Sequence, residues 1–272
     1  MFLSACAHQA RLFFVALQFF TRLPVPRWVG FEPHWLHHAS RYFALVGIVV
    51  AAISAAVYAV AACVLPAPVA TVLATCAGVY ATGAFHEDGF ADVCDGFGGG
   101  VTPQRVLDIM KDSRVGAYGA IGIALLLGLK CLLLAQLAQS TQSVPGAAVA
   151  ALFLAHPLSR LAACTLIWRL DYVRTVDAKA KPLAQHMSGA ELAIGAACAL
   201  LPVLLIGVCG WLTWTSMLAG ALLGGVAAAW LAWKCVQRIG GYTGDCLGAV
   251  QQASEVAIYL GVLAAGGHAA WR

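Results

Sequence analysis

Long runs of apolar residues dominate the hydrophobic pattern of this chain. A helix that crosses a bilayer needs about 20 largely apolar residues, and seven stretches meet that requirement. They lie at residues 43–65, 68–86, 117–139, 146–168, 190–210, 214–233 and 248–266. The pattern predicts an all-α polytopic membrane bundle of about seven spans, which forms one integral membrane domain over residues 1–272.

The first apolar stretch, residues 11–20, is too short to cross a bilayer. The segment that follows it, residues 21–26 (TRLPVP), contains two prolines, which end a helix. We therefore expect a short interfacial or re-entrant helix near the N-terminus.

Composition supports a membrane protein. Hydrophobic residues make up 61% of the chain and charged residues 10%, whereas soluble proteins carry about 25% charged residues. This excludes an ordinary cytosolic enzyme, a disordered protein and a nucleic-acid-binding protein, and it makes the lipid bilayer the expected partner. The ten cysteines form no C-x-x-C pair and lie mostly in apolar runs, so we expect neither a disulfide framework nor a zinc site.

The basic residues are distributed asymmetrically between the predicted loops. If the seven spans alternate in direction, one set of loops comprises residues 21–42, 87–116, 169–189 and 234–247. This set holds 12 of the 16 Lys and Arg residues, whereas the opposite loops (66–67, 140–145 and 211–213) hold none. Because loops rich in Lys and Arg remain in the cytoplasm, the first set is predicted to be cytoplasmic.

Half of the acidic residues fall in one of these cytoplasmic loops, which spans residues 87–116. Six of the 12 acids lie there: Glu87, Asp88, Asp92, Asp95, Asp108 and Asp112. Two carboxylates about 5 Å apart repel by roughly 3 kcal/mol at an effective dielectric constant of about 20. Such a cluster is tolerated if its members share a cation or if some of them are protonated.

The spacing of these acids indicates a metal site. Asp88, Asp92 and Asp95 stand at i, i+4 and i+7, and Asp108 and Asp112 at i, i+4, so on helices each set occupies one face. Oxygen ligands without a convergent set of His or Cys favour Mg²⁺ or Mn²⁺, which often complete their shells with water and substrate phosphate. Phosphoryl transfer is the chemistry that follows. The alternative is a solvated acidic loop with Asp-Gly turns.

Other polar positions could take part in the same chemistry. The segment 240–248 (GGYTGDCLG) could form a backbone anion site from Thr243 and Gly244 and add Asp245 to the metal ligands, or it could be a simple helix break. Asp112 and Arg114 offer a base and a phosphate-binding guanidinium two residues apart. His86, at the end of a predicted span, suits a packing role as well as a ligand or an acid.

Several ionisable residues fall inside predicted spans, where charge is costly. His156 and Arg160 share a helix face at i, i+4, and Lys130 and Glu255 lie at mid-span depth. They could pair with one another or contact a substrate. The G-x-x-x-G segment 220–224 indicates close packing between two spans.

Four segments together resemble a known family. They are FFTRLPVP (19–26), FHEDGFADVCDG (85–96), KDSRVGAYG (111–119) and GGYTGDCLGA (240–249). Their order and spacing in a multi-span chain closely resemble the cobalamin synthases, the adenosylcobinamide-GDP ribazoletransferases. The resemblance covers nearly the whole chain. Two positions depart from the family pattern: Ala84 stands where a glycine is expected, and Glu87 stands where an apolar residue is common.

The resemblance implies an integral membrane transferase of the bacterial cytoplasmic (inner) membrane, with its active site facing the cytoplasm. Such an enzyme joins adenosylcobinamide-GDP to α-ribazole or its 5′-phosphate. It requires Mg²⁺, releases GMP and forms adenosylcobalamin or its 5′-phosphate. A homo-oligomer is compatible with this class.

A looser likeness links the chain to the CDP-alcohol phosphotransferases. Their signature pairs Asp-x-x-Asp-Gly with Asp-x-x-x-Asp, as at residues 92–96 and 108–112. It suggests that the first three aspartates bind metal and that the last acts as the base. The expected metal ligands are Asp88, Asp92, Asp95, Asp108 and Asp245. The expected catalytic residues are Asp112, Arg114 and His86, and the expected substrate contacts are Arg114, Thr243, Gly244 and Arg160.

Two other functions compete with this one. A lipid-making CDP-alcohol phosphotransferase would release CMP. A transporter would account for charged residues inside spans, but the acids concentrate at one interface and no inverted repeat is evident. A purely structural role for the protein would leave the aspartate cluster unexplained.

Overall fold

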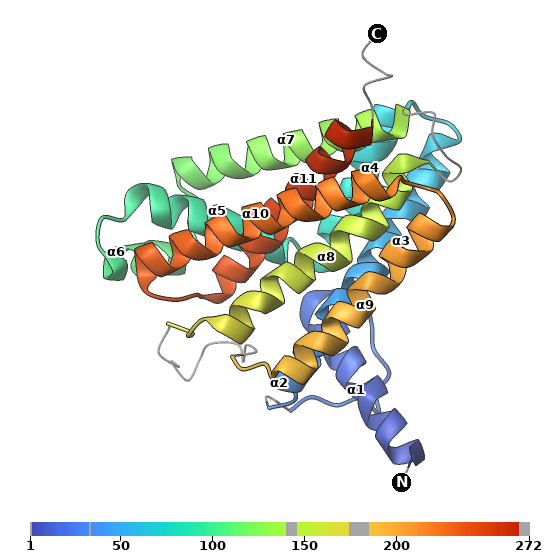
Figure 1. Ribbon diagram of the computed structural model, residues 1–272. Coiled ribbons are helices and arrows are strands. Elements are labelled where there is room, and N and C mark those ends of the chain that lie inside the picture. Colours follow the sequence, from blue (N-terminus) through green and yellow to red (C-terminus); the bar gives the residue numbers. More distant parts are fainter. Residues whose placement is uncertain (1, 33, 140–145, 174–184, 267–272) are drawn as a thin grey trace.

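Helices make up nearly all of the structure, a computed structural model that describes residues 2–32, 34–139, 146–173 and 185–266 (Figure 1). The helices are α1 (Phe2–Phe20), α2 (Trp35–Ala39), the 3-10 turn η1 (Ser40–Tyr42), α3 (Phe43–Ala62), α4 (Ala67–Thr82), α5 (Phe85–Gly99), α6 (Pro103–Lys111), α7 (Ala117–Gln139), α8 (Ala147–Arg169), α9 (Gly189–Val208), α10 (Trp214–Ile239) and α11 (Gly244–Gly266). Within the described ranges the extended pairing is limited to an isolated bridge between Tyr172 and Tyr242. The predicted all-α class is confirmed.

Six helical segments of the described chain are long and apolar enough to cross a membrane. They are the continuous segment Trp35–Ala62 and the helices α7, α8, α9, α10 and α11. A seventh crossing exists if α4 and α5 are counted as one span, although they meet at an angle of 90°. The chain is a multi-pass membrane protein, and the predicted total of seven depends on that bent pair.

The predicted span 68–86 was wrong at its C-terminal end. Helix α4 stops at Thr82 because Gly83 and Ala84 both adopt the left-handed conformation, with φ of 65° and 60°. Helix α5 then starts at Phe85 in a new direction. The apolar run continues through this bend, so hydrophobicity alone could not reveal it.

Two further boundaries differ from the prediction. The N-terminal helix α1 begins at Phe2 and not at residue 11, because Ser, His and Gln interrupt the apolar run without interrupting the helix. Its buried residues Leu12, Val15 and Ala16 pack toward α2 and α3. The predicted loop 87–116 is largely helical, since it contains most of α5 and all of α6. Thr102 caps α6 by accepting a hydrogen bond from the Arg105 backbone N–H, and Pro103 starts it.

Helices α8 and α11 form the centre of the bundle. In their most apolar segments 72% and 78% of the residues are buried, against 28% for α9 and 33% for α7 and α10. The outer helices expose a belt of large apolar side chains, which suits contact with lipid: Ile121, Leu125, Leu132, Leu200, Leu204, Leu218, Leu222 and Val226. The predicted G-x-x-x-G contact is confirmed, because Gly220 and Gly224 lie against Ile258 of α11.

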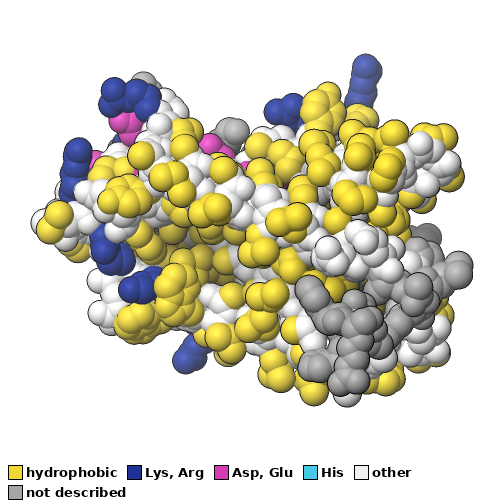
Figure 2. All heavy atoms as spheres, turned by 90° about the horizontal axis from the view of Figure 1, so that it is seen from above, with side chains coloured by type: hydrophobic (Ala, Val, Ile, Leu, Met, Phe, Trp, Pro, Cys, Tyr) yellow, Lys and Arg dark blue, Asp and Glu magenta, His cyan; other side chains and the backbone are white. Residues whose placement is uncertain are grey.

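The connections gather at two ends of the bundle (Figure 1). One end carries the α3–α4 and α9–α10 turns, and the other carries α5, α6, the end of α8 and the α10–α11 turn. Figure 2 shows a largely hydrophobic face, on which charged side chains gather mainly on the side of α5 and α6. Residues 140–145 and 174–184 of the predicted loops lie outside the described residues, and so do Arg174, Lys179, Lys181 and Arg272.

Candidate active site

The acidic residues of α5 form one stripe along the helix. Asp88, Asp92 and Asp95 share a face, as their spacing predicted. Asp88 is exposed, Asp92 is half-buried and Asp95 is buried. The stripe therefore runs from the surface at the start of α5 into the packed interface with α7.

Asp95 binds the first turn of α7. Its Oδ2 accepts a hydrogen bond from the Gly116 backbone N–H at 2.7 Å, and its Oδ1 accepts one from the Gly119 backbone N–H at 2.8 Å. A side chain at either glycine would collide with the Asp95 carboxylate. A carboxylate at a helix N-terminus is stabilised by charge-assisted bonds and by the helix dipole. Asp95 thus has a structural task that the sequence reasoning, which treated it as a metal ligand, missed.

Asp245 approaches the acidic stripe from α11. A Cβ added to Gly89 would lie 2.9 Å from Asp245 Cα, and one added to Gly248 would lie 3.0 Å from the His86 carbonyl. These two glycines let the backbones of α5 and α11 cross in close contact. Asp245 therefore lies beside α5 at the level of Gly89, which follows Asp88 by one residue and precedes Asp92 by three.

The turn before α11 is built around buried Thr243. Its Oγ1 accepts a hydrogen bond from the Cys246 backbone N–H at 3.4 Å and lies 3.4 Å from Asp245 Oδ2. The half-buried Gly244 begins the helix. A backbone bridge stabilises the turn: the Tyr242 N–H donates a hydrogen bond to the Asp171 carbonyl at 3.0 Å. Burial raises the pKa of the Tyr242 hydroxyl above its ordinary value.

Asp108 and Asp112 lie on the next helix, α6, and at its C-terminal end. Asp108, on the exposed face of α6, accepts a hydrogen bond from Gln104 Nε2 at 3.0 Å. Asp112 ends α6 and forms an ion pair with Arg114, whose Nη2 lies 2.6 Å from Asp112 Oδ2. The hydrogen bonds from Arg114 lower the pKa of the Asp112 carboxyl to about 2. Because the pair is exposed and screened by solvent, a phosphate can replace the Asp112 carboxylate on the Arg114 guanidinium.

His86 and Arg160 lie inside the bundle and away from the acidic stripe. His86 is 4% exposed and stacks on Phe20, with ring centroids 5.4 Å apart. Arg160 is 3% exposed, and its Nη1 donates to the His156 carbonyl at 3.0 Å. Both residues line an apolar cavity of about 20 Å³ among Phe19, Phe43 and neighbouring side chains. These contacts favour the packing interpretation of His86.

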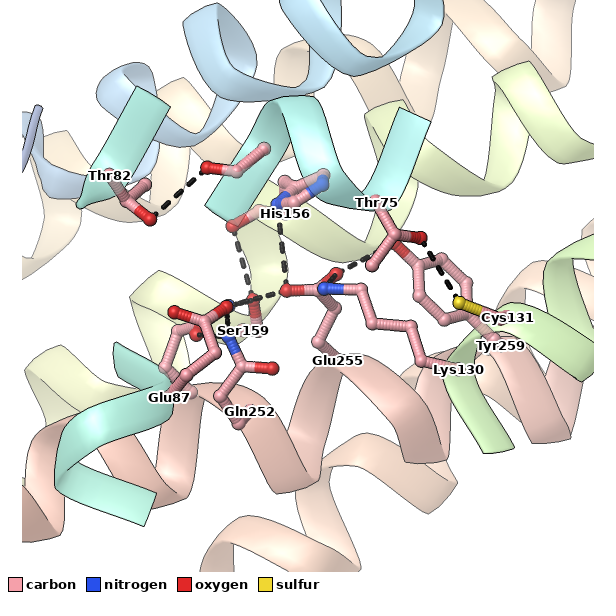
Figure 3. A network of polar contacts seen from close by, with 12 residues as sticks. Thr75, Thr82, Glu87, Lys130, Cys131, His156, Ser159, Gln252, Glu255 and Tyr259 are labelled. Atoms are coloured by element: carbon pink, nitrogen blue, oxygen red, sulfur yellow. Dashed lines mark hydrogen bonds and ion pairs between the residues drawn. The ribbon is translucent and has the colours of Figure 1, made fainter. Parts of the chain in front are cut away.

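A second set of polar residues forms a buried network in the middle of the bundle (Figure 3). Lys130 Nζ lies 2.6 Å from Glu255 Oε1, and Tyr259 OH donates to the same oxygen at 2.9 Å. Gln251 Nε2 donates to Glu255 Oε2 at 2.6 Å, and His156 Nδ1 lies 3.5 Å from that oxygen. The mid-span charges therefore pair with one another. Removing one partner of such a buried pair costs about 3–5 kcal/mol, because the other charge remains without compensation.

Some residues that shape this site were missed from the sequence. Gln251 and Gln252 are buried in α11, and a pair of amides inside an apolar span was the signal that could have revealed them. Arg238 of α10 holds the end of α5, because its Nη2 donates to the carbonyls of Phe97 at 2.9 Å and Gly100 at 2.5 Å. From the sequence, Arg238 counts only toward the Lys and Arg excess of the loop 234–247.

The chemistry of the donors at the α5–α11 crossing fits a hard divalent cation. Among the residues that the structure describes, no group of three or more His, Cys, Asp or Glu side chains could hold a metal ion as it stands. Mg²⁺, however, is usually bound by one or two carboxylates together with water and substrate phosphate. Asp88, Asp92 and Asp245 supply carboxylates of that kind, whereas the two oxygens of Asp95 already accept backbone hydrogen bonds.

Comparison with known proteins supports one family. Residues 12–263 match the family model of cobalamin-5-phosphate synthase. The chain is 48% identical over 267 residues to an adenosylcobinamide-GDP ribazoletransferase of Leptothrix cholodnii, which covers 96% of this chain and 98% of that protein. Proteins of the same name from Shewanella frigidimarina and Vibrio cholerae are 49% and 42% identical, over 95% and 94% of this chain and 96% and 95% of their own lengths.

No solved structure matches this chain. The family model alone covers well over half of the sequence, and the relatives extend over nearly all of it. The chain belongs to the cobalamin-5-phosphate synthase family.

Proposed function

We propose that this protein is an adenosylcobinamide-GDP ribazoletransferase with its active site at the crossing of α5 and α11. It joins adenosylcobinamide-GDP to α-ribazole or α-ribazole 5′-phosphate, and it forms adenosylcobalamin or its 5′-phosphate and GMP. The names of the relatives give the substrates. The observation that carries the location is the close contact of Gly89 with Asp245, because it brings Asp245, which is far from α5 in sequence, beside the helix that carries Asp88 and Asp92.

The reaction is a displacement at phosphorus. A ribose hydroxyl of α-ribazole attacks the pyrophosphate phosphorus that carries the cobinamide, the bond to the bridging oxygen breaks, and GMP leaves. Asp88, Asp92 and Asp245 are the candidate ligands of Mg²⁺, and one or two of these carboxylates would hold the ion together with water and substrate phosphate. When bound, this ion neutralises the negative charge that develops on the pyrophosphate oxygens. Asp108 lies on the exposed face of α6 and is a further candidate ligand.

The residues after α6 bind phosphate and accept the proton. Arg114 exchanges Asp112 for a phosphate oxygen of the substrate, and Asp112 then accepts the proton of the attacking hydroxyl. Loss of its cationic partner raises the pKa of Asp112 from about 2 toward its ordinary value. A carboxylate remains a weak base near neutral pH, so positioning and electrostatic stabilisation contribute more to the rate than proton abstraction does. Thr243 and Gly244 supply a backbone clamp for a second phosphate oxygen.

The active end of the bundle faces the cytoplasm of a bacterium, and the protein resides in the cytoplasmic membrane. The distribution of Lys and Arg supports this orientation. Soluble, highly charged substrates then reach the acidic stripe from water, while the large corrin ring can rest against the apolar walls of the bundle.

Substitution of Asp92 tests the proposed site. We expect Asp92→Asn to abolish Mg²⁺-dependent GMP release from adenosylcobinamide-GDP and α-ribazole, while insertion into the membrane is retained. Asp171→Asn is the matched control, because Asp171 is an exposed aspartate at the same end of the bundle whose described contact uses its carbonyl. Near-normal turnover in Asp92→Asn would contradict the metal assignment, and CMP release from a CDP-alcohol would indicate a lipid enzyme instead.

A further inference from the structure

Glu87 is a buried acid on α5 to which the proposed chemistry gives no task. It is 7% exposed, and its Oε1 accepts a hydrogen bond from Gln252 Nε2 of α11 at 2.8 Å. The same Gln252 nitrogen donates to Gln251 Oε1 at 3.0 Å, and Gln251 in turn binds Glu255. Figure 3 shows this chain of contacts running from α5 to the ion pair at the centre of the bundle. Helix α5 is therefore tied to the most buried part of the protein through one carboxylate.

The other oxygen of Glu87 faces a small polar cavity. Glu87 Oε2, Arg160 Nε and Gln252 Oε1 are buried atoms without a hydrogen-bond partner in the protein. All three side chains line a cavity of about 10 Å³. This volume is at the lower limit for one water molecule, which typically makes about three hydrogen bonds to such groups. One water would link the Glu87 carboxylate on α5 to the guanidinium on α8.

The position of Glu87 on the helix relates it to the acidic stripe. Successive residues of an α-helix are rotated by about 100°. Glu87 consequently lies about 100° to one side of Asp88 and about 140° from Asp92, whereas Gly89, which touches Asp245, lies about 100° to the other side of Asp88 and about 60° from Asp92. The acidic face is thus held between a hydrogen-bonded flank and a close-packed flank.

A small rotation of α5 would misplace its carboxylates. Side-chain ends lie about 5–6 Å from a helix axis, so a rotation of about 10° moves them by roughly 1 Å. A misplacement of about 1 Å at a reacting centre can lower the rate roughly 100-fold. Contacts that fix the rotation of α5, such as the Glu87 hydrogen bond, therefore bear on the position of these carboxylates.

We propose that Glu87 and Gln252 are positioning residues, which fix the rotation of α5 and thereby set where the Asp88 and Asp92 carboxylates point. This proposal rests on the proposed function, because it assigns the position of α5 to metal binding. Neither residue touches the reacting atoms. Each acts indirectly, by holding α5, the helix that carries Asp88 and Asp92.

Three variants test this role. Gln252→Leu removes the donor to Glu87, and Glu87→Leu removes the carboxylate that accepts this hydrogen bond. Glu87→Gln retains an acceptor for Gln252 and is the conservative rescue. The matched control is Ile206→Ala, which creates a cavity in α9, a helix that makes no extensive contact with α5.

Three measurements are made on the full-length protein in nanodiscs: Mn²⁺ affinity by EPR, kcat for GMP release, and hydrogen exchange of the α5 amides without metal. We expect both Leu variants to bind Mn²⁺ roughly 10–100-fold more weakly and to exchange the α5 amides faster. Glu87→Gln should stay within about threefold of wild type, in line with its retained bond. Ile206→Ala should melt at a lower temperature with unchanged Mn²⁺ affinity and α5 exchange.

Unchanged Mn²⁺ affinity and α5 exchange in the Leu variants would overturn the positioning role, even if both variants melt at a lower temperature. Wild-type protein that binds no Mn²⁺ and releases no GMP would overturn the proposed function, and with it the link between α5 and metal. The two failures differ because the first appears only in the variants and the second appears in the wild type.

Discussion

Ala84 takes an unusual backbone conformation at the bend between α4 and α5. Among the described residues it is the one non-glycine with a positive φ, at 60°. The left-handed region costs a residue with a Cβ roughly 1–2 kcal/mol. The family resemblance led us to expect glycine at this position, and the structure gives the physical reason. The bend turns the chain by 90°, and α5, which carries Asp88, then crosses α11 at Gly89.

We predict that Ala84→Gly stabilises the protein. Relief of the left-handed strain should exceed the added flexibility of the unfolded chain, which leaves a gain of about 0.5–1 kcal/mol. The measurement is the thermal unfolding midpoint in detergent. The control is Ala91→Gly in the helical part of α5, which should destabilise by about 1 kcal/mol because glycine is a poor helix former. A fall in the midpoint for Ala84→Gly would show that the bend is not strained.

Arg114 lowers the pKa of Asp112, and its removal should change how Asp112 titrates. The folded-state pKa of about 2 lies below the ordinary value, so the carboxylate stays charged as the pH falls until about 2. In Arg114→Gln the pKa should rise toward about 3.9. Between these two values Asp112 is then ionised in the wild type and largely protonated in the variant.

A ¹³C NMR titration of labelled aspartate carboxyls in micelles measures this shift, with Asp112→Asn identifying the resonance. Lys111→Gln removes a neighbouring cation that is absent from the causes of the low pKa, so it should leave the Asp112 titration nearly unchanged. An equal titration in the wild type and Arg114→Gln would mean that the ion pair does not persist in solution.

At the scale of helices, the active site depends on how closely α5 and α11 approach. Gly89 and Gly248 allow that approach, because a Cβ at either position would meet the backbone of the other helix. The atoms that a Cβ at Gly89 would meet belong to the Asp245 backbone, which cannot move aside as a flexible side chain can. An added methyl group must therefore move one helix relative to the other.

We predict that Gly89→Ala lowers kcat by at least about tenfold, because separating the helices displaces Asp245 from the α5 carboxylates. Gly225→Ala is the control, since a Cβ at Gly225 of α10 meets nothing within 4 Å. There alanine should be neutral or slightly stabilising. GMP release is assayed with both purified variants. Full activity of Gly89→Ala would contradict an active site at the crossing of α5 and α11.

The helices show what apolar length can and cannot predict. Runs of apolar residues located α7, α8 and α9 closely, because bilayer thickness fixes the length of a span. The bend at Gly83 was hidden, since backbone conformation leaves no trace in hydropathy. The candidate site was predicted as a set of residues, but Asp95 was assigned to metal because its partners, Gly116 and Gly119, follow 21 and 24 residues later. Such long-range contacts depend on tertiary packing.

At the scale of the whole molecule, the two ends of the bundle differ in charge and so predict an orientation. The α3–α4 and α9–α10 turns, at the end away from α5 and α6, carry Cys63 and Cys209, both exposed and unpaired. Ser113, in the turn between α6 and α7, is exposed at the acidic end. If basic loops remain inside the cell, these positions lie on opposite sides of the membrane.

We therefore predict opposite labelling in single-cysteine proteins made from a cysteine-free background. A small membrane-impermeant thiol reagent should label Cys63 or Cys209 in intact cells. It should label Ser113→Cys only after the cytoplasmic membrane is permeabilised. Labelling under that condition shows that the thiol at position 113 can react with the reagent. Labelling of Ser113→Cys in intact cells would show that the acidic end of the bundle faces the outside of the cell. Nucleotide substrates made in the cytoplasm could not reach Asp88 and Asp92 from that side, so the same result would count against the proposed reaction as well as the topology.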